Sequence, residues 1–393
     1  MSEFDDQKVT PIQPFLNTPE PPERKNPAKK IILLAVLLLA LILAVCLLMF
    51  RDQLNLRRVR QLFSGQSTSE VIYQYDDGSK NAYVSCHNAL AALTGSGLTI
   101  FDTAGSELGT IQHVYQTPSL RTGKDLVLGC DVGGNRLSAI NQSGTAVLDL
   151  ETDGTILDAD ISGGDAICYL ELLKGYRAVV TVYDKKQNQI YRWYSASQYM
   201  NQCAVSESGK YLCAVALDSA SGGYESTAVL FRTDQEEPIA QVSLGGQLIW
   251  DLQFVDDDKI CAVGETQLVL LNTAGEVLGT YDYGEGYVTD YAVGGFTALS
   301  MNMYKAGNRF SVVTVDTAGN QLGEQYIGEE VLSISTAGDY CAVLTASHLY
   351  VYDKNLNLIA TGEDLSAVSS VVMQDDGSVI LLGGGTGRLY IPN

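Results

Sequence analysis

Histidine and tryptophan are scarce in this 393-residue chain, which contains three and two of them. The histidines, His87, His113 and His348, lie far apart, and no motif places a nucleophile and an acid beside any of them. A Ser/His/Asp triad needs that arrangement, so we predict no catalytic residue. Zinc sites need Cys and His at short spacings, and no CxxC or CxH pattern occurs. We therefore predict no metal site and no cofactor.

Positive charge is scarce beyond residue 60. The chain has 25 Lys and Arg and 46 Asp and Glu, of which 9 and 6 fall in the first 60 residues, leaving 16 against 40. Proteins bind nucleic acid largely by displacing phosphate counterions with basic side chains, and anionic membrane surfaces attract basic patches. The acidic balance therefore argues against both as partners of residues 61–393.

Proline is scarce outside the N-terminus, and no disulfide framework is indicated. Six of the 9 prolines fall within the first 27 residues, so we expect residues 1–30 to be a disordered, Pro-rich tail. Of the 8 cysteines, Cys46 stands apart and seven are scattered between Cys86 and Cys341. Their number is odd and several sit in apolar runs such as DYCAVLT, so we interpret them as small buried residues.

One long hydrophobic run is present, IILLAVLLLALILAVCLLMF at residues 31–50. As a helix this run spans about 30 Å, the thickness of a bilayer's hydrocarbon core. We predict a single transmembrane helix, uncleaved because no small-x-small site follows it, and a juxtamembrane helix or linker over residues 51–69. Basic residues flank the run equally on both sides, so the positive-inside rule does not decide its orientation. We expect a cytoplasmic N-terminus in the cell membrane and the large C-terminal part outside, with the reverse as the alternative.

A ten-residue segment recurs along the rest of the chain. It reads FDTAGSELGT at 101–110, LNTAGEVLGT at 271–280 and VDTAGNQLGE at 315–324, with weaker copies between and after these. The spacing is about 40 residues, the size of a four-stranded propeller blade. Asp or Asn can accept a hydrogen bond from its own backbone two residues on, and Gly accepts the positive φ after a type I turn. The segment therefore predicts a hairpin that joins the third and fourth strands of a blade.

The count of these units predicts how the ring closes. Eight third strands can be recognised, and the last, RLYIPN at 388–393, has no fourth strand after it. The segment SEVIYQYDDGS at 69–79 can supply that strand, which removes both free sheet edges. The predicted fold class is all-β: an eight-bladed β-propeller over residues 70–393, closed by an N-terminal strand and preceded by one transmembrane helix. Seven blades with one irregular unit is the alternative.

With this anchor and ring, the chain resembles an uncharacterised family of single-span, membrane-anchored β-propeller proteins of Gram-positive bacteria. The Pro-rich tail, the Leu-rich run and the D-T-A-G-x-x-L-G turns carry the resemblance. It implies an extracytoplasmic propeller and assigns no catalytic residue. The eight-blade architecture is also similar to the scaffold lipoprotein of outer-membrane assembly and to quinoprotein-type propellers. The WD40 signature is absent, because Trp250-Asp251 falls in a first strand.

Tyrosine is unevenly distributed and supplies the candidate binding residues. In the third to sixth blades, five tyrosines fall in or near the connections between second and third strands or between blades, which share one face of a propeller. Tyrosine offers a large contact area at low entropic cost and is enriched at binding surfaces. We predict that this face binds a protein segment or a glycan; the alternative is that these rings pack between blades. The five are Tyr194, Tyr224, Tyr283, Tyr287 and Tyr304.

The predicted function is a membrane-anchored, non-enzymatic binding or scaffold module of the cell envelope, with a protein or glycan partner. One alternative is an envelope hydrolase or lyase with its site in the propeller channel. Clustered carboxylates or a perturbed His in the channel would favour the enzyme, and a lining of Ala, Gly and Val would favour the binding module. A second alternative is a sensor that transmits ligand binding through the membrane helix.

Overall fold

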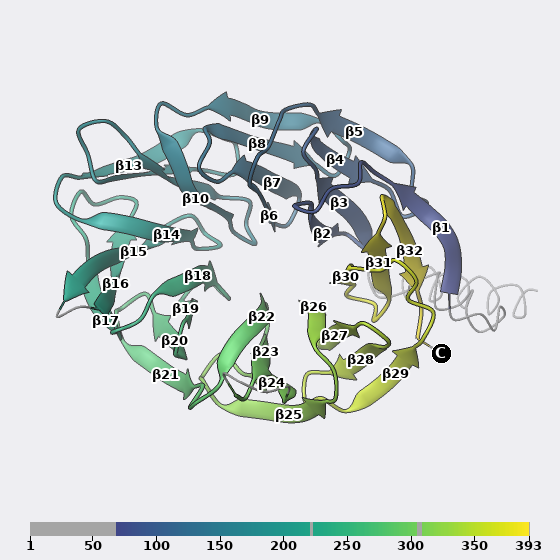
Figure 1. The fold of residues 1–393 in the computed structure, drawn as a ribbon. Helices are drawn as coiled ribbons and strands as arrows, with labels where there is room; N and C mark the ends of the chain where they lie inside the picture. The colour runs from purple at the N-terminus through teal and green to yellow at the C-terminus, as the bar shows by residue number, and fades with distance from the viewer. Residues whose placement is uncertain (1–67, 221–222, 305–308, 393) are drawn as a thin grey trace, which may run out of the picture. The chain divides into compact units, whose positions relative to one another are not determined.

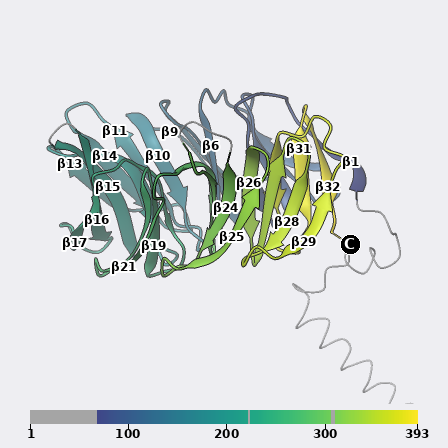
Figure 2. The same ribbon diagram turned by 60° about the horizontal axis from the view of Figure 1, so that its bottom comes forward.

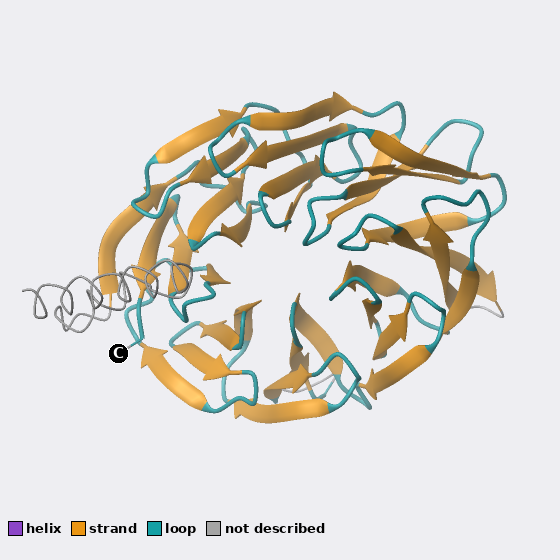
Figure 3. Cartoon of the chain, turned by 180° about the vertical axis from the view of Figure 1, so that it is seen from behind, coloured by secondary structure: helices purple, strands orange, loops and turns teal. Residues whose placement is uncertain are grey.

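Eight four-stranded antiparallel sheets stand radially around a central channel (Figure 1). Figure 2 shows the same ring tilted, and Figure 3 shows it from behind, with strands and loops making up the ring. This computed structural model describes residues 68–220, 223–304 and 309–392. The predicted tail, membrane helix and most of the linker lie outside the described residues. Within the described ranges, no helix is long and apolar enough to cross a bilayer.

Each blade has strand A beside the channel and strand D on the rim, and blades 1 to 7 use four consecutive strands in order. Blade 1 consists of β2 (Ala82–Cys86), β3 (Ala89–Leu93), β4 (Leu98–Phe101) and β5 (Glu107–Ile111), and blade 2 of β6 (Pro118–Thr122), β7 (Leu126–Asp131), β8 (Arg136–Asn141) and β9 (Ala146–Glu151). Blade 3 consists of β10 (Thr155–Ile161), β11 (Ile167–Leu172), β12 (Ala178–Tyr183) and β13 (Gln189–Ser195), and blade 4 of β14 (Tyr199–Val205), β15 (Tyr211–Ala220), β16 (Gly223–Arg232) and β17 (Ala240–Gly245). Blade 5 consists of β18 (Ile249–Phe254), β19 (Lys259–Gly264), β20 (Gln267–Asn272) and β21 (Val277–Asp282), and blade 6 of β22 (Tyr287–Val293), β23 (Thr297–Asn302), β24 (Phe310–Val315) and β25 (Gln321–Ile327). Blade 7 consists of β26 (Val331–Ala337), β27 (Tyr340–Thr345), β28 (Leu349–Asp353) and β29 (Leu358–Gly362). Blade 8 consists of β30 (Ser370–Met373), β31 (Val379–Gly383) and β32 (Thr386–Tyr390), with β1 (Thr68–Gln74) as its strand D.

The N-terminal strand β1 closes the ring by pairing antiparallel with β32 (Figure 1). Tyr73 is fully buried, and its ring meets Phe101 of blade 1 edge-on with centroids 5.7 Å apart. The Tyr75 hydroxyl donates to the Thr386 carbonyl oxygen at 2.9 Å. The prediction of eight blades sealed by an N-terminal strand is therefore confirmed, although the strand ends at Gln74 and not at residue 79.

The recurring turn has the hydrogen bonds that its sequence predicts. Asp102 Oδ1 accepts from the backbone N–H groups of Ala104 and Ser106, both at 2.8 Å, and the Ser106 bond lowers the pKa of Asp102. Gly105 takes the left-handed conformation, with φ of 87°. The same two acceptor bonds recur at the first turn residue of five further blades, namely Asn141, Asp184, Asn272, Asp316 and Asp353.

The second glycine of the motif has a different role. Gly279 lies in β21 directly against the C–D turn of blade 6, and a Cβ on it would be 1.9 Å from the Ala318 carbonyl oxygen. Gly109 meets the turn of blade 2 in the same way, with 2.1 Å to the Gly144 carbonyl oxygen. The turn of one blade thus rests on the rim strand of the blade before it. The repeated D-T-A-G-x-x-L-G segment therefore encodes both a turn and a contact between blades.

The core is divided between the blades. Eight clusters of buried apolar side chains occur in the described part of the chain, one at each interface between neighbouring blades. All seven cysteines of the described residues are buried and unbridged, in agreement with their interpretation as small core residues. Cys168 and Cys203 bring their sulfur atoms within 3.6 Å across the interface of blades 3 and 4.

Candidate functional site

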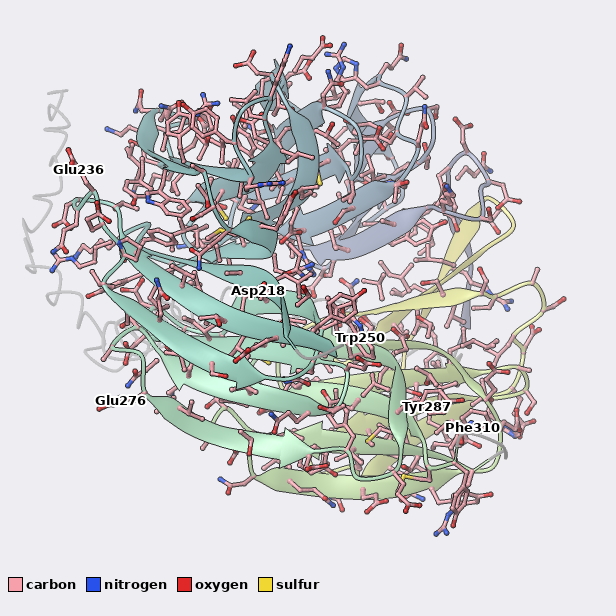
Figure 4. The ribbon with its side chains drawn as sticks, turned by 60° about the vertical axis from the view of Figure 1, so that its left-hand side comes forward. Asp218, Glu236, Trp250, Glu276, Tyr287 and Phe310 are labelled. Atoms are coloured by element: carbon pink, nitrogen blue, oxygen red, sulfur yellow. The ribbon has the colours of Figure 1, made fainter. Side chains whose placement is uncertain are left out.

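Strand direction places two kinds of connection on each face of the ring. Because neighbouring strands are antiparallel, the B–C and D–A connections share one face and the A–B and C–D connections share the other. Figure 4 shows Glu236 and Glu276, from C–D connections, on one side of the ring and Tyr287 and Phe310 on the other. We call the side of Tyr287 and Phe310 the BC/DA face.

Four of the five predicted tyrosines contribute to the BC/DA face. Tyr194, Tyr224 and Tyr304 are 44%, 57% and 49% exposed, and Tyr287 is half-buried. The structure does not gather all four in one site. Tyr287 and Tyr304 line a common hollow, whereas Tyr194 ends the rim strand of blade 3 and Tyr224 lies on the long hairpin of blade 4.

The hollow beside Tyr287 and Tyr304 has a volume of about 440 Å³. Glu265 and Glu285 contribute its charged groups, and Met303 adds an apolar side chain. The Tyr287 hydroxyl accepts a hydrogen bond from the amide of Asn302 at 3.2 Å. Two aromatic rings beside two carboxylates form a surface on which sugar rings or a peptide side chain can stack and hydrogen-bond.

Tyr283 corrects the prediction. It is only 3% exposed and packs at the interface of blades 5 and 6 with Leu268, Leu299 and Met301. The chain turns after β21, and the backbone N–H of Tyr283 donates to the Thr266 carbonyl oxygen at 3.0 Å. With its backbone held there, the ring lies in the core. Tyr283 is therefore a packing residue, as the alternative for these tyrosines supposed, and it is withdrawn from the binding face.

A more compact aromatic group lies where blades 3 and 4 meet, and the prediction named only one of its members, Tyr194. Tyr176 and Tyr194 place their ring centroids 4.8 Å apart, and the Arg177 guanidinium lies 4.5 Å from the centre of the Tyr199 ring. Lys174 is exposed beside them in the same B–C connection. The available signal was the run K-G-Y-R at 174–177. We call Lys174, Tyr176, Arg177, Tyr194 and Tyr199 the blade-3 patch.

Local backbone geometry explains how this connection presents its side chains. Gly175 takes a φ of 95°, and the Tyr176 N–H donates to the Leu173 carbonyl oxygen at 3.0 Å, which forms a tight turn. The Arg177 N–H then donates to the Ser195 carbonyl oxygen at 2.7 Å. Glycine is suited to the left-handed position, and the turn leaves the side chains on both sides of it exposed.

The channel is the second candidate site, with a cavity of about 580 Å³. Arg121 from blade 2 donates to Asp251 of blade 5 at 2.5 Å, although 130 residues separate them. The Asp251 side chain is 2% exposed. Apolar residues such as Val84 and Val293 line other parts of the wall. The wall thus combines clustered carboxylates, which we expected of an enzyme, with aliphatic side chains, which we expected of a binding module.

Two further carboxylates near Arg121 join blade 3 to blade 4. Asp158 Oδ2 accepts from the Cys203 N–H at 2.9 Å, and Asp160 Oδ2 accepts from the Val205 N–H at 3.2 Å. Burial raises the pKa of Asp158 to about 7 and that of Asp160 to about 6, while the Arg121 charge acts in the opposite direction. Asp160 also lines the channel cavity. These carboxylates therefore hold blades together and change their charge near neutral pH.

Residues 60–383 match the model of DUF5711, a family of unknown function. The chain belongs to the DUF5711 family. The match covers all of the propeller except its last strand, β32, and begins after the apolar run, which lies outside it. It agrees with the resemblance to an uncharacterised propeller family. No curated protein matches the chain.

Solved structures similar to this DUF5711 chain are propellers of low sequence identity. The crystal structure of BamB from Moraxella catarrhalis is 12% identical with a TM-score of 0.51, covering 83% of this chain and 98% of that one. The C-terminal WD40 domain of Sif2 is 9% identical with a TM-score of 0.56, covering 82% and 98%. At these identities the similarity shows the propeller fold alone.

One Ser–His–Glu cluster of the DUF5711 propeller has the composition of a catalytic triad. His348 Nδ1 lies 2.7 Å from Ser347 Oγ and 3.2 Å from Glu329 Oε1. A triad requires one ring nitrogen to face the nucleophile and the other to face the acid. Here Nδ1 faces both groups, and the Ser347 hydroxyl donates directly to Glu329. This geometry does not activate Ser347, and His348 is a surface residue.

Replacing Asp158 and Asp160 together by Asn is expected to change how stability depends on pH. Burial raises both pKa values above the ordinary 3.8, so the folded chain binds protons more tightly than the unfolded chain. Their contribution to the free energy of unfolding therefore falls as the pH rises from about 4 to about 7. Asn stays neutral and retains an oxygen acceptor for the two blade-4 N–H groups. The variant should match the parent at or below about pH 4 and exceed it near pH 8 in urea unfolding. Lower stability of the variant near pH 8 would show that the ionised carboxylates stabilise the ring through Arg121.

Proposed function

We propose that this DUF5711 chain is a non-enzymatic binding module of the cell envelope, anchored in the membrane by residues 31–50 with its propeller outside the cell. The BC/DA face of blades 3 to 6 binds a segment of a partner protein or a glycan. The observation that carries this proposal is the exposure of Tyr194, Tyr224 and Tyr304 on that face, each more than 40% accessible in the folded ring.

The physical argument concerns the free energy of leaving these rings in water. A folded ring that exposes large aromatic side chains on one face forgoes the hydrophobic gain of burying them, and tyrosine is enriched at interaction surfaces. The scaffold is rigid, because each blade has its own packed interface with both neighbours. A rigid support lowers the entropic cost of binding, and a membrane anchor raises the effective concentration of the module near an envelope partner.

Replacing Tyr194, Tyr224 and Tyr304 together by Ser is expected to reduce partner capture by about tenfold or more, since each ring removes a desolvated contact of 1 kcal/mol or so. The full chain in detergent micelles serves as bait for an envelope extract, and captured proteins and polysaccharides are quantified. The three side chains are exposed, so the urea unfolding midpoint should stay unchanged.

A matched control uses an exposed apolar side chain on the opposite face. Leu358 is 56% exposed at the start of rim strand β29, beside the C–D connection of blade 7, and Leu358→Ser should leave capture unchanged. Equal capture by the triple variant and the parent would rule out the tyrosine face as the binding site. Equal loss in both variants would show that capture is non-specific.

A channel enzyme is the second candidate, favoured by the raised pKa of Asp160 at the wall of the 580 Å³ cavity. A carboxyl group that holds its proton near neutral pH can act as a general acid, for example on a glycosidic bond. Release of reducing ends from envelope polysaccharide by the full chain, lost on Asp160→Asn, would establish this function. Absence of any release at both mildly acidic and neutral pH would leave the binding module alone.

A further inference from the structure

The blade-3 patch combines aromatic area with positive charge. Tyr176, Tyr194 and Tyr199 are 41%, 44% and 48% exposed. Arg177 lies over the Tyr199 ring, and Lys174 is exposed on the same turn. Tyrosine and arginine are the residue types that most often dominate the energy of protein interfaces.

Positive charge at this place is unusual for the domain, in which 16 basic residues face 40 acidic ones. No carboxylate among the described residues forms an ion pair with Lys174 or Arg177. Seven of the 13 other basic side chains in the described part of the ring form ion pairs, namely Arg121, Arg136, Arg192, Arg232, Lys259, Lys354 and Arg388. The blade-3 patch holds two neighbouring cations without an ion pair, which can attract carboxylates to a domain of net negative charge.

The surroundings limit the size of the anion. Tyr199 pairs with Leu217 at the base of the blade-4 hairpin, and the same hairpin continues to the exposed side chains of Asp218 and Glu225. A long polyanion that crossed the patch would also meet these carboxylates within about one Debye length, roughly 8 Å at physiological salt. A short segment with one or two carboxylates next to an apolar side chain meets the cations and the rings alone.

We propose that the blade-3 patch binds a short acidic segment of a partner protein, with its carboxylates on Lys174 and Arg177 and an apolar side chain against Tyr194 and Tyr199. This inference rests on the proposed binding function and specifies its partner class. Guanidinium–carboxylate pairing supplies orientation, and the tyrosine rings supply the apolar contact. An anionic glycan is the competing occupant, and the test separates the two.

The test selects ligands for the full chain in detergent micelles from a phage-displayed library of random short peptides. Selected peptides should be enriched in Asp and Glu next to an aromatic or aliphatic residue, and their affinity should fall as NaCl is raised. Lys174→Glu with Arg177→Glu should weaken binding by about tenfold or more. Polygalacturonate, a carboxylated polysaccharide, serves as the competing probe and should bind no more tightly to the parent than to this variant.

The matched control lies on the opposite face of the same blade. Lys185 and Lys186 are exposed in its C–D turn, so Lys185→Glu with Lys186→Glu makes the same change in net charge and should leave peptide affinity unchanged. Peptides without an acidic excess, or equal loss in both charge variants, would overturn the inference. So would polygalacturonate binding that depends on Lys174 and Arg177. Peptides that lose binding when Tyr194, Tyr224 and Tyr304 are replaced together by Ser, but keep it in the Lys174→Glu, Arg177→Glu variant, would overturn the inference and leave the proposed function standing. If neither peptide nor polysaccharide binds, both fail.

Discussion

Deleting residues 68–75 from the full chain is expected to destroy the cooperative unfolding of the propeller. The deletion removes β1, exposes the edge of β32 and empties the fully buried position of Tyr73 against Phe101. Replacing a buried aromatic side chain of this size by Ala costs about 3–5 kcal/mol by itself, and here the hydrogen-bonded ladder to β32 is lost as well. Urea unfolding followed by circular dichroism should show a broad transition at a much lower midpoint.

A rescue experiment separates ring closure from non-specific damage. A synthetic peptide with the sequence TSEVIYQY, residues 68–75, should bind the shortened chain and restore a sharp transition. A peptide with Asp in place of Tyr73 should not, because a carboxylate in that buried site costs several kcal/mol. If the shortened chain unfolds at the parental midpoint and ignores both peptides, β1 does not hold the ring closed.

The blades were predictable because their recurrent turns depend on local chemistry. The bonds that Asp102 accepts come from residues two and four positions ahead, so residue identity in a short window suffices to recognise the hairpin. The period then places the strands, and the missing last strand places β1. The positive φ could be read in the same window for Gly105, but not for Gln187 and Leu356, which take φ of 61° and 60° without being glycine.

The candidate site was less predictable because it depends on contacts between blades. Tyr283 and Tyr304 look alike in sequence, yet Tyr283 is 3% exposed and Tyr304 is 49% exposed. The difference arises from the path of the chain after β21 and from the packing of blade 6 against it, neither of which local sequence encodes. Arg121 and Asp251 illustrate the same limit, since their ion pair joins strands 130 residues apart.

Replacing Gly279 by Ala is expected to lower the free energy of unfolding by about 3 kcal/mol, at the upper end of what overpacking costs. The new Cβ would lie 1.9 Å from the Ala318 carbonyl oxygen, and that oxygen belongs to a backbone turn held by the hydrogen bonds of Asp316. Blades 5 and 6 must separate to admit the methyl group, which opens the apolar cluster between them. The urea midpoint of the full chain measures the effect, and Gly109→Ala should act similarly because it meets the Gly144 carbonyl oxygen at 2.1 Å.

Gly95 provides the control for backbone effects of the same substitution. Nothing lies within 4 Å of a Cβ built on Gly95, and no left-handed φ is required there. Gly95→Ala should therefore leave stability unchanged or raise it by up to about 1 kcal/mol through the lower entropy of the unfolded chain. If Gly279→Ala were as stable as Gly95→Ala, the second glycine of the motif would not be a contact residue, and its recurrence in three rim strands would need another cause. A large loss at Gly279 and Gly109, with none at Gly95, would instead show that the D-T-A-G-x-x-L-G repeat serves the fit between blades as much as the turn.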